Sequence, residues 1–135
     1  MKVLAFDPGY ERLGVAVVER HNGKEVLLFS DCVRTSAKLN FAQRLKILGE
    51  EVEKLIKKWK PDAVALENLY FENNAKTAMD VSAVRGMLCY IAATRGLEVF
   101  EYTPLQVKVA ITGYGKSDKR AVAMMVQKLL IIKKK

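Results

Sequence analysis

The sequence is poor in the side chains that most often build metal centres and nucleophilic triads. It has one histidine and two cysteines among 135 residues. The histidine, His21, directly precedes an Asn-Gly pair that predicts a hairpin turn, so a histidine-based triad or zinc site is excluded. Cys32 and Cys89 are far apart and in apolar surroundings, and we expect them to be reduced thiols in the core.

The chain also has no apolar run near the roughly 20 residues that a membrane span needs. No leader precedes the first predicted strand, which begins at Val3, so we expect no signal peptide and a cytoplasmic location. Only three prolines are present, and no repeat, low-complexity segment or linker interrupts the sequence. These absences predict a single domain over residues 1–135.

Acidic residues are scarce toward the end of the chain. Residues 104–135 contain eight basic side chains and one acidic side chain, Asp118, so they carry +7 of the total net charge of +8. Such asymmetry is typical of a surface that binds a polyanion, most simply nucleic acid. A solvated lysine-rich surface explains the charge equally well.

Apolar periodicity predicts an α/β domain with a mixed five-stranded sheet. Val3–Asp7 and Leu13–Arg20 are too close in sequence for a helix between them, and the Asn-Gly turn then leads into Glu25–Thr35. The remaining predicted elements are helices at 41–59, 75–95, 104–111 and, capped by Ser117, up to about residue 130, and strands at 63–67 and 98–102. Three antiparallel strands followed by parallel strands, with helices on both faces, form the ribonuclease-H-like arrangement.

Two of the predicted strands end in a carboxylate. Val3–Phe6 is a continuous apolar run, which is typical of a central strand buried on both faces, and Asp7 follows it. Ala63–Leu66 leads to Glu67 in the same way, and a right-handed crossover would place it parallel to the first strand. The two carboxylates would then emerge side by side at the edge where α/β sheets usually place their sites.

Two neighbouring carboxylates repel each other, so either one pKa rises or a cation lies between them. Oxygen ligands without histidine or cysteine favour Mg²⁺ or Mn²⁺. The alternative is that Glu67 pairs with a lysine and Asp7 belongs to an ordinary turn. A separate row of small residues, Ala78, Ser82 and Gly86, permits close packing either on the sheet or against a second copy of the helix.

An ordered set of motifs runs through the whole chain. The motifs are Asp7-Pro8-Gly9 with Gly14, Glu67 with a polar-aromatic loop ending in Asn73-Asn74, Ala83-Val84-Arg85-Gly86, Phe100-Glu101-Tyr102 with Gln106-Val107-Lys108, and Gly113-Tyr114-Gly115-Lys116-Ser117-Asp118-Lys119. Together they resemble the RuvC family of bacterial nucleases, which resolve four-way (Holliday) DNA junctions. The resemblance implies a ribonuclease-H-like endonuclease of DNA recombination and repair that works as a homodimer, with a branch-migration helicase complex as a partner.

The resemblance also implies roles for individual residues. Asp7 and Glu67 match two catalytic, metal-binding carboxylates of a site that holds two Mg²⁺ ions when complete, with Mn²⁺ as an alternative. Tyr70, or Phe71 beside it, matches the aromatic residue that enters the junction centre, where it would replace part of a lost base stack.

Basic residues and the small-residue row have counterparts as well. Lys108 and Lys119 match residues that contact the DNA backbone, and Lys116 and Arg120 belong to the same basic region. The helix around Ala78, Ser82 and Gly86 matches the dimer interface.

The chain departs from the family pattern at its end. The family completes its site with two further aspartates in a C-terminal helix, whereas this sequence stops at Lys135. Asp118 is the only acidic residue after Glu101, and its expected place at the start of the preceding helix makes it a poor substitute. We therefore expect a nuclease domain lacking its last catalytic helix through truncation, which binds metal weakly and cuts poorly as given.

Three other interpretations share some of these features. A ribonuclease-H-like nuclease for ribosomal RNA precursors has a similar opening, but the loop after Glu67 and the Arg85-Gly86 helix fit the junction resolvases better. A junction-binding protein without catalysis would explain the missing aspartates. A sugar-kinase or actin-like ATPase lobe also opens with Asp-x-Gly, but it needs a second lobe to enclose ATP.

Overall fold

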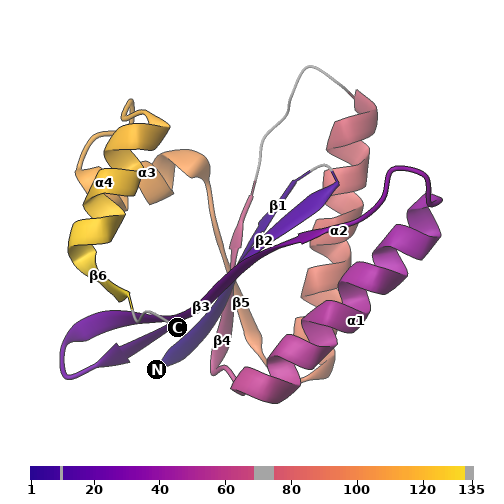
Figure 1. Cartoon of the computed structure of the whole chain (residues 1–135), viewed down its shortest axis with the longest axis horizontal. Coiled ribbons are helices and arrows are strands. Elements are labelled where there is room, and N and C mark those ends of the chain that lie inside the picture. Colours follow the sequence, from indigo (N-terminus) through magenta and orange to yellow (C-terminus); the bar gives the residue numbers. More distant parts are fainter. Residues whose placement is uncertain (10, 69–74, 133–135) are drawn as a thin grey trace.

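The computed structural model describes residues 1–9, 11–68 and 75–132. These residues form a mixed sheet with helices on both sides (Figure 1). The elements are β1 (Lys2–Pro8), β2 (Arg12–His21), β3 (Lys24–Arg34), α1 (Phe41–Trp59), β4 (Ala63–Glu67), α2 (Ala75–Thr94), β5 (Glu98–Tyr102), α3 (Pro104–Thr112), α4 (Lys119–Leu129) and β6 (Leu130–Ile132). None of the helices in the described part of the chain combines the length and the apolar character of a membrane span.

The sheet has the strand order β5-β4-β1-β2-β3-β6. β1 lies in the middle, antiparallel to β2 and parallel to β4, and β5 continues the parallel half. The predicted ribonuclease-H-like arrangement of five strands is therefore confirmed. β6 is an additional short strand, which pairs in parallel with β3 at residues 25–27.

Local sequence signals account for the turns and helix ends around this sheet. Asn22 and Gly23 both have positive φ angles, 52° and 76°, as the two-residue hairpin between β2 and β3 requires. Asn40 caps α1 by accepting a hydrogen bond from the Gln43 N–H, and the Gln43 side chain accepts one from the Asn40 N–H in return. Helix α1 ends at Trp59, and the capping residue Lys60 adopts the left-handed conformation.

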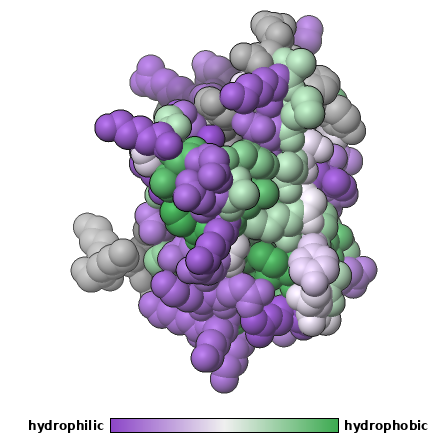
Figure 2. Space-filling model, turned by 90° about the vertical axis from the view of Figure 1, so that its right-hand side faces the viewer, coloured by the Kyte–Doolittle hydropathy of each residue, from purple (hydrophilic) through white to green (hydrophobic). Residues whose placement is uncertain are grey.

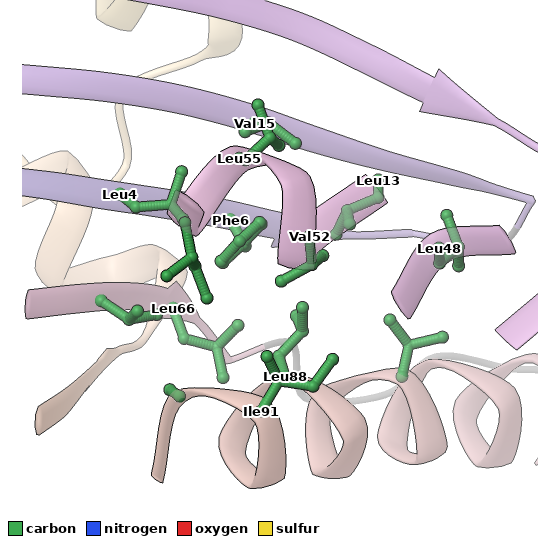
Figure 3. Packing of buried hydrophobic residues seen from close by; sticks show 14 of the residues in the cluster. Leu4, Phe6, Leu13, Val15, Leu48, Val52, Leu55, Leu66, Leu88 and Ile91 are labelled. Atoms are coloured by element: carbon green, nitrogen blue, oxygen red, sulfur yellow. The ribbon is translucent and has the colours of Figure 1, made fainter. Parts of the chain in front are cut away.

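Helices α1 and α2 cover one face of the sheet and enclose the core with it (Figure 3). Leu4 and Phe6 of β1 are 0% and 3% exposed, and they pack among Val52 of α1 and Leu88 of α2, each 1% exposed. Burial of such a side chain contributes about 1.5–3 kcal/mol. The strand that leads to Asp7 is thus firmly anchored on this side.

The opposite face of the sheet is much more open. Helices α3 and α4 lie on that side (Figure 1), and neither contains a fully buried residue. Ala5 of β1 and Ala16 of β2 remain partly exposed there. The expectation that β1 is buried on both faces is therefore wrong, because these helices leave a cleft above the central strands.

The two cysteines are free thiols, as predicted. Cys89 is partly buried, but Cys32 is exposed. The expectation of a core position is wrong for Cys32, because β6 pairs only with residues 25–27 of β3 and leaves this part of the strand at the sheet edge.

Candidate active site

Asp7 and Glu67 lie at the same edge of the sheet. Parallel pairing of β1 with β4 brings Phe6 opposite Leu66, so the next residues of the two strands, Asp7 and Glu67, are neighbours. Their side chains are hydrogen-bonded to each other. The structure thus brings together the two carboxylates that the sequence places at the ends of these strands.

The close approach of the two carboxylates changes their acidity. Burial raises the pKa of Asp7, while the hydrogen bond from Glu67 and the charge of Lys119 lower it in part. Burial also raises the pKa of Glu67, and the negative charge of Asp7 and their hydrogen bond raise it further, against a lowering by Lys108. Without a cation, the pair therefore tends to share one proton between its two carboxyl groups.

The pair opens into a cleft of about 380 Å³ on the open face of the sheet. Ala5 pairs with Ala16 on one side and with Ala65 on the other, so a row of alanines forms the floor of the cleft. Gly14 lies opposite Asp7, and a Cβ atom there would be 3.4 Å from the Asp7 Cβ. Small side chains thus keep the space beside the carboxylates clear.

Helices α3 and α4 bring positive charge to this cleft. Lys108 of α3 and Lys119 of α4 are close enough to lower the pKa of Glu67 and of Asp7, respectively. Lys116 and Arg120 are exposed nearby in sequence, but neither affects the pKa of the pair. Two of the four predicted DNA-contacting cations are therefore near enough to act electrostatically on the carboxylates.

The turn between α3 and α4 differs in one detail from the sequence prediction. The N-cap of α4 is Asp118, whose carboxylate accepts a hydrogen bond of 2.8 Å from the Ala121 N–H. Ser117 is instead buried, and its hydroxyl is 2.6 Å from the Thr112 hydroxyl and donates to the Tyr114 carbonyl oxygen. The prediction of Ser117 as the cap is wrong because α3 engages this residue, and the contact fixes the turn just before Lys119.

The donor set of the site fits a hard divalent cation. Asp7 and Glu67 offer carboxylate oxygens, which Mg²⁺ and Mn²⁺ prefer, whereas zinc sites usually include nitrogen or sulfur ligands as well. Across the described part of the chain, no group of three or more His, Cys, Asp or Glu side chains could hold a metal. The described residues therefore supply a pair of ligands, whose mutual repulsion a cation would relieve.

The remaining predicted site residues fall into two groups. Tyr70 and Phe71 lie outside the described residues. In α2, Ala78 is half-buried, whereas Ser82 and Gly86 are exposed. A Cβ atom at Gly86 would have no neighbour within 4 Å, so packing on the sheet does not explain this glycine.

Sequence reasoning gave no role to two residues that the structure singles out. Tyr102 pairs with Glu67 in the sheet and lines the cleft with 44% of its surface exposed. Its position at the end of β5, like that of Glu67 at the end of β4, is a signal that could have found it. Arg44 of α1 is buried, and it lies four residues before Leu48, a spacing that places both on one helix face.

Comparison with known proteins gives one consistent family. Residues 3–135 match the family model described as crossover junction endodeoxyribonuclease RuvC. A relative with this name from Ruminiclostridium cellulolyticum is 42% identical over 130 residues, which cover 96% of this chain and 78% of the relative. Another, from Thermosipho melanesiensis, is 40% identical over 134 residues, covering 99% of this chain and 85% of the relative.

The structural comparison agrees. The structure of Thermus thermophilus RuvC in complex with a Holliday junction substrate superposes with a TM-score of 0.91 at 32% identity. The match covers 99% of this chain and 82% of that one. These similarities favour a junction resolvase over a nuclease for ribosomal RNA precursors, a junction-binding protein without catalysis or an ATPase lobe.

Proposed function

The chain belongs to the RuvC family of crossover junction endodeoxyribonucleases, and from this we propose that Asp7 and Glu67 are two of its catalytic carboxylates. Its activity is that of the family, the resolution of four-way DNA junctions by endonucleolytic cleavage. The observation that carries the assignment of the site is the hydrogen-bonded pair at the ends of β1 and β4, open to a cleft beside two lysines.

RuvC nucleases depend on a metal, and we propose Mg²⁺ as the ion held by Asp7 and Glu67, with Mn²⁺ as an alternative and two ions in a complete site. When bound, such ions activate a water molecule and stabilise the leaving oxygen of a phosphodiester. The chain's own task is to present both carboxylates ionised. Lys108 and Lys119 support this task, because each lowers the pKa of one carboxyl group.

We assign the DNA contacts to the basic residues around the cleft. Lys108 and Lys119 would bind phosphates next to the cleaved bond, and Lys116 and Arg120 would bind phosphates farther out. Each neutralised phosphate releases counterions, so binding should weaken as the salt concentration rises. Tyr70 or Phe71 remains our candidate for insertion at the junction centre, on the basis of the family motif.

We further propose that the protein is a homodimer with α2 at the interface. The exposed side of α2 is uncharged over most of its length, with Met79 and Tyr90 72% and 71% exposed. Figure 2 views the side of the molecule that carries α1 and α2, where a band of apolar and weakly polar surface runs beside a hydrophilic area. Symmetric cleavage of two opposed strands would follow from two such sites. A branch-migration helicase complex remains an expectation from the family resemblance.

Substitution of either carboxylate tests the proposed site. Asp7→Asn or Glu67→Gln should abolish cleavage of a synthetic four-way junction with Mg²⁺, because the amide no longer supplies a charged ligand. Junction affinity can be measured by fluorescence anisotropy without a divalent metal, so that the DNA is not cleaved. It should remain near that of the wild type, because Lys108 and Lys119 are unchanged.

Asp31→Asn provides a matched control. Asp31 also lines the cleft but lies on β3, in register with Val15, so its substitution should leave cleavage unchanged. Undiminished cutting by Asp7→Asn or by Glu67→Gln would refute the assignment. Equal affinity of the wild type for a junction and for plain duplex would argue against junction selectivity.

A further inference from the structure

Arg44 is a charged side chain buried near the start of α1. It is 9% exposed, while every other charged residue of this helix is at least partly exposed. A cation near a helix N-terminus faces the positive end of the helix dipole, and burial of a charge is costly unless partners compensate it. Helix formation therefore does not explain an arginine at this position, and its tertiary contacts must do so.

One of these contacts leads to the turn that follows Asp7. Arg44 Nε donates a hydrogen bond of 3.1 Å to the Thr35 hydroxyl oxygen. The Thr35 N–H in turn donates one of 3.1 Å to the carbonyl oxygen of Glu11, in the turn between β1 and β2. Glu11 has a φ of 66°, in the left-handed region that non-glycine residues rarely occupy. Such a conformation persists only where surrounding contacts hold it.

Arg44 also borders a cavity between this turn, α1 and α2. The cavity has a volume of about 10 Å³, and Gly9, Arg12 and Asp80 are among the residues that line it with Arg44. A space of this size holds no more than a single water molecule, which excludes a ligand site. The side chains around it are therefore packing contacts, and they join the turn after Asp7 to α1 and to α2.

We propose that Arg44 is a positioning residue for the carboxylate pair, an inference that rests on the proposed function of that pair. It holds the turn after β1 against α1 and α2 and so fixes the end of β1, where Asp7 lies. Arg44 also lines the same cavity as Asp80 and Val84 of α2, the helix that comes after β4 in the chain.

Three substitutions separate this role from a merely structural one. Arg44→Met keeps the length of the side chain without its charge, Arg44→Lys keeps the charge without Nε, and Thr35→Val removes the acceptor. The rate constant for junction cleavage should fall about 10- to 100-fold in Arg44→Met, because misplacement of a catalytic group by about 1 Å can cost on the order of 100-fold. Arg44→Lys and Thr35→Val should show smaller losses of the same kind.

The measurements are single-turnover cleavage over a range of Mn²⁺ concentrations, Mn²⁺ binding without DNA by electron paramagnetic resonance, and junction affinity by anisotropy. We expect weaker Mn²⁺ binding and a higher Mn²⁺ requirement in all three variants, with unchanged junction affinity. Lys46→Met, an exposed cation on the same helix, is the control and should behave as the wild type.

The inference is overturned if the folded variants bind Mn²⁺ and cut junctions as the wild type does, even with a lower melting temperature. If Arg44→Met does not fold, the same measurements on Arg44→Lys and Thr35→Val test the inference. A wild-type protein that neither binds Mn²⁺ through Asp7 and Glu67 nor cuts junctions would instead refute the proposed site.

Discussion

Replacement of Gly86 by leucine tests whether α2 forms the contact between two copies of the chain. In a single chain, a side chain at this position enters open space, since a Cβ atom meets no heavy atom within 4 Å. Glycine within a helix costs about 1 kcal/mol relative to alanine, and leucine is almost as favourable as alanine. The isolated chain should therefore gain about 0.8 kcal/mol of stability from the substitution.

The proposed dimer should respond in the opposite direction. Extra carbon atoms inserted into a close contact cost about 1–3 kcal/mol, and a twofold interface includes the substitution twice. Association should then weaken by about 2–6 kcal/mol, which corresponds to about 30-fold or more in the dissociation constant. The same substitution thus stabilises the chain and separates the copies.

Sedimentation equilibrium gives the dissociation constant, and urea unfolding at concentrations below it gives the stability of the chain. Ala42→Leu is a suitable control, because Ala42 is an exposed small residue on α1 and should change neither the association nor the helix packing. If Gly86→Leu dimerises as tightly as the wild type, the interface lies elsewhere. A wild type that stays monomeric at every concentration would refute the dimer itself.

Two further predictions concern the charges at the cleft. Folding raises the pKa of both Asp7 and Glu67. At pH values between their ordinary and their raised pKa, the folded protein therefore binds more protons than the unfolded chain. The metal-free protein should lose stability as the pH rises through this window. Urea unfolding from about pH 4 to pH 8 should show the free energy of unfolding falling as the pH rises. Asp7→Asn should weaken this pH dependence. An equal pH dependence in both proteins would contradict the sharing of one proton by the pair. Lys119→Gln should raise the pKa of Asp7 further, as measured by carboxyl-carbon NMR titration, since the lysine charge lowers it in the wild type. An equal shift in Lys116→Gln would show that the effect is not specific to Lys119.

Much of the fold and the pairing of the two carboxylates were predictable because their signals are local. The hairpin at Asn22 and Gly23 follows from two adjacent residues that tolerate positive φ angles. Asp7 and Glu67 each follow the apolar run of their own strand directly, so a single right-handed crossover through α1 is enough to bring them together. No detail of side-chain packing was needed for either prediction.

The rest depends on contacts between distant elements, which no local pattern specifies. Ala5 is compatible with a covered or an open sheet face, and only the placement of α3 and α4 decides between them. Ser117 and Asp118 are adjacent and equally suitable as helix caps, but Thr112 engages the first of them. Arg44 has the spacing of a buried residue and the chemistry of an exposed one, and its tertiary contacts, among them the hydrogen bond to Thr35, decide for burial.

The parallel pairing of β1 with β4 also bears on the order in which the molecule becomes able to act. The antiparallel strands β1, β2 and β3 close through short turns, whereas β1 meets β4 only across a connection that includes two strands and α1. Such non-local contacts form late in folding, because the entropy of closing a long loop is lost before they stabilise the chain. A newly synthesised or partly unfolded chain therefore carries its two carboxylates apart. The capacity to cut DNA arises with the native sheet and disappears with it.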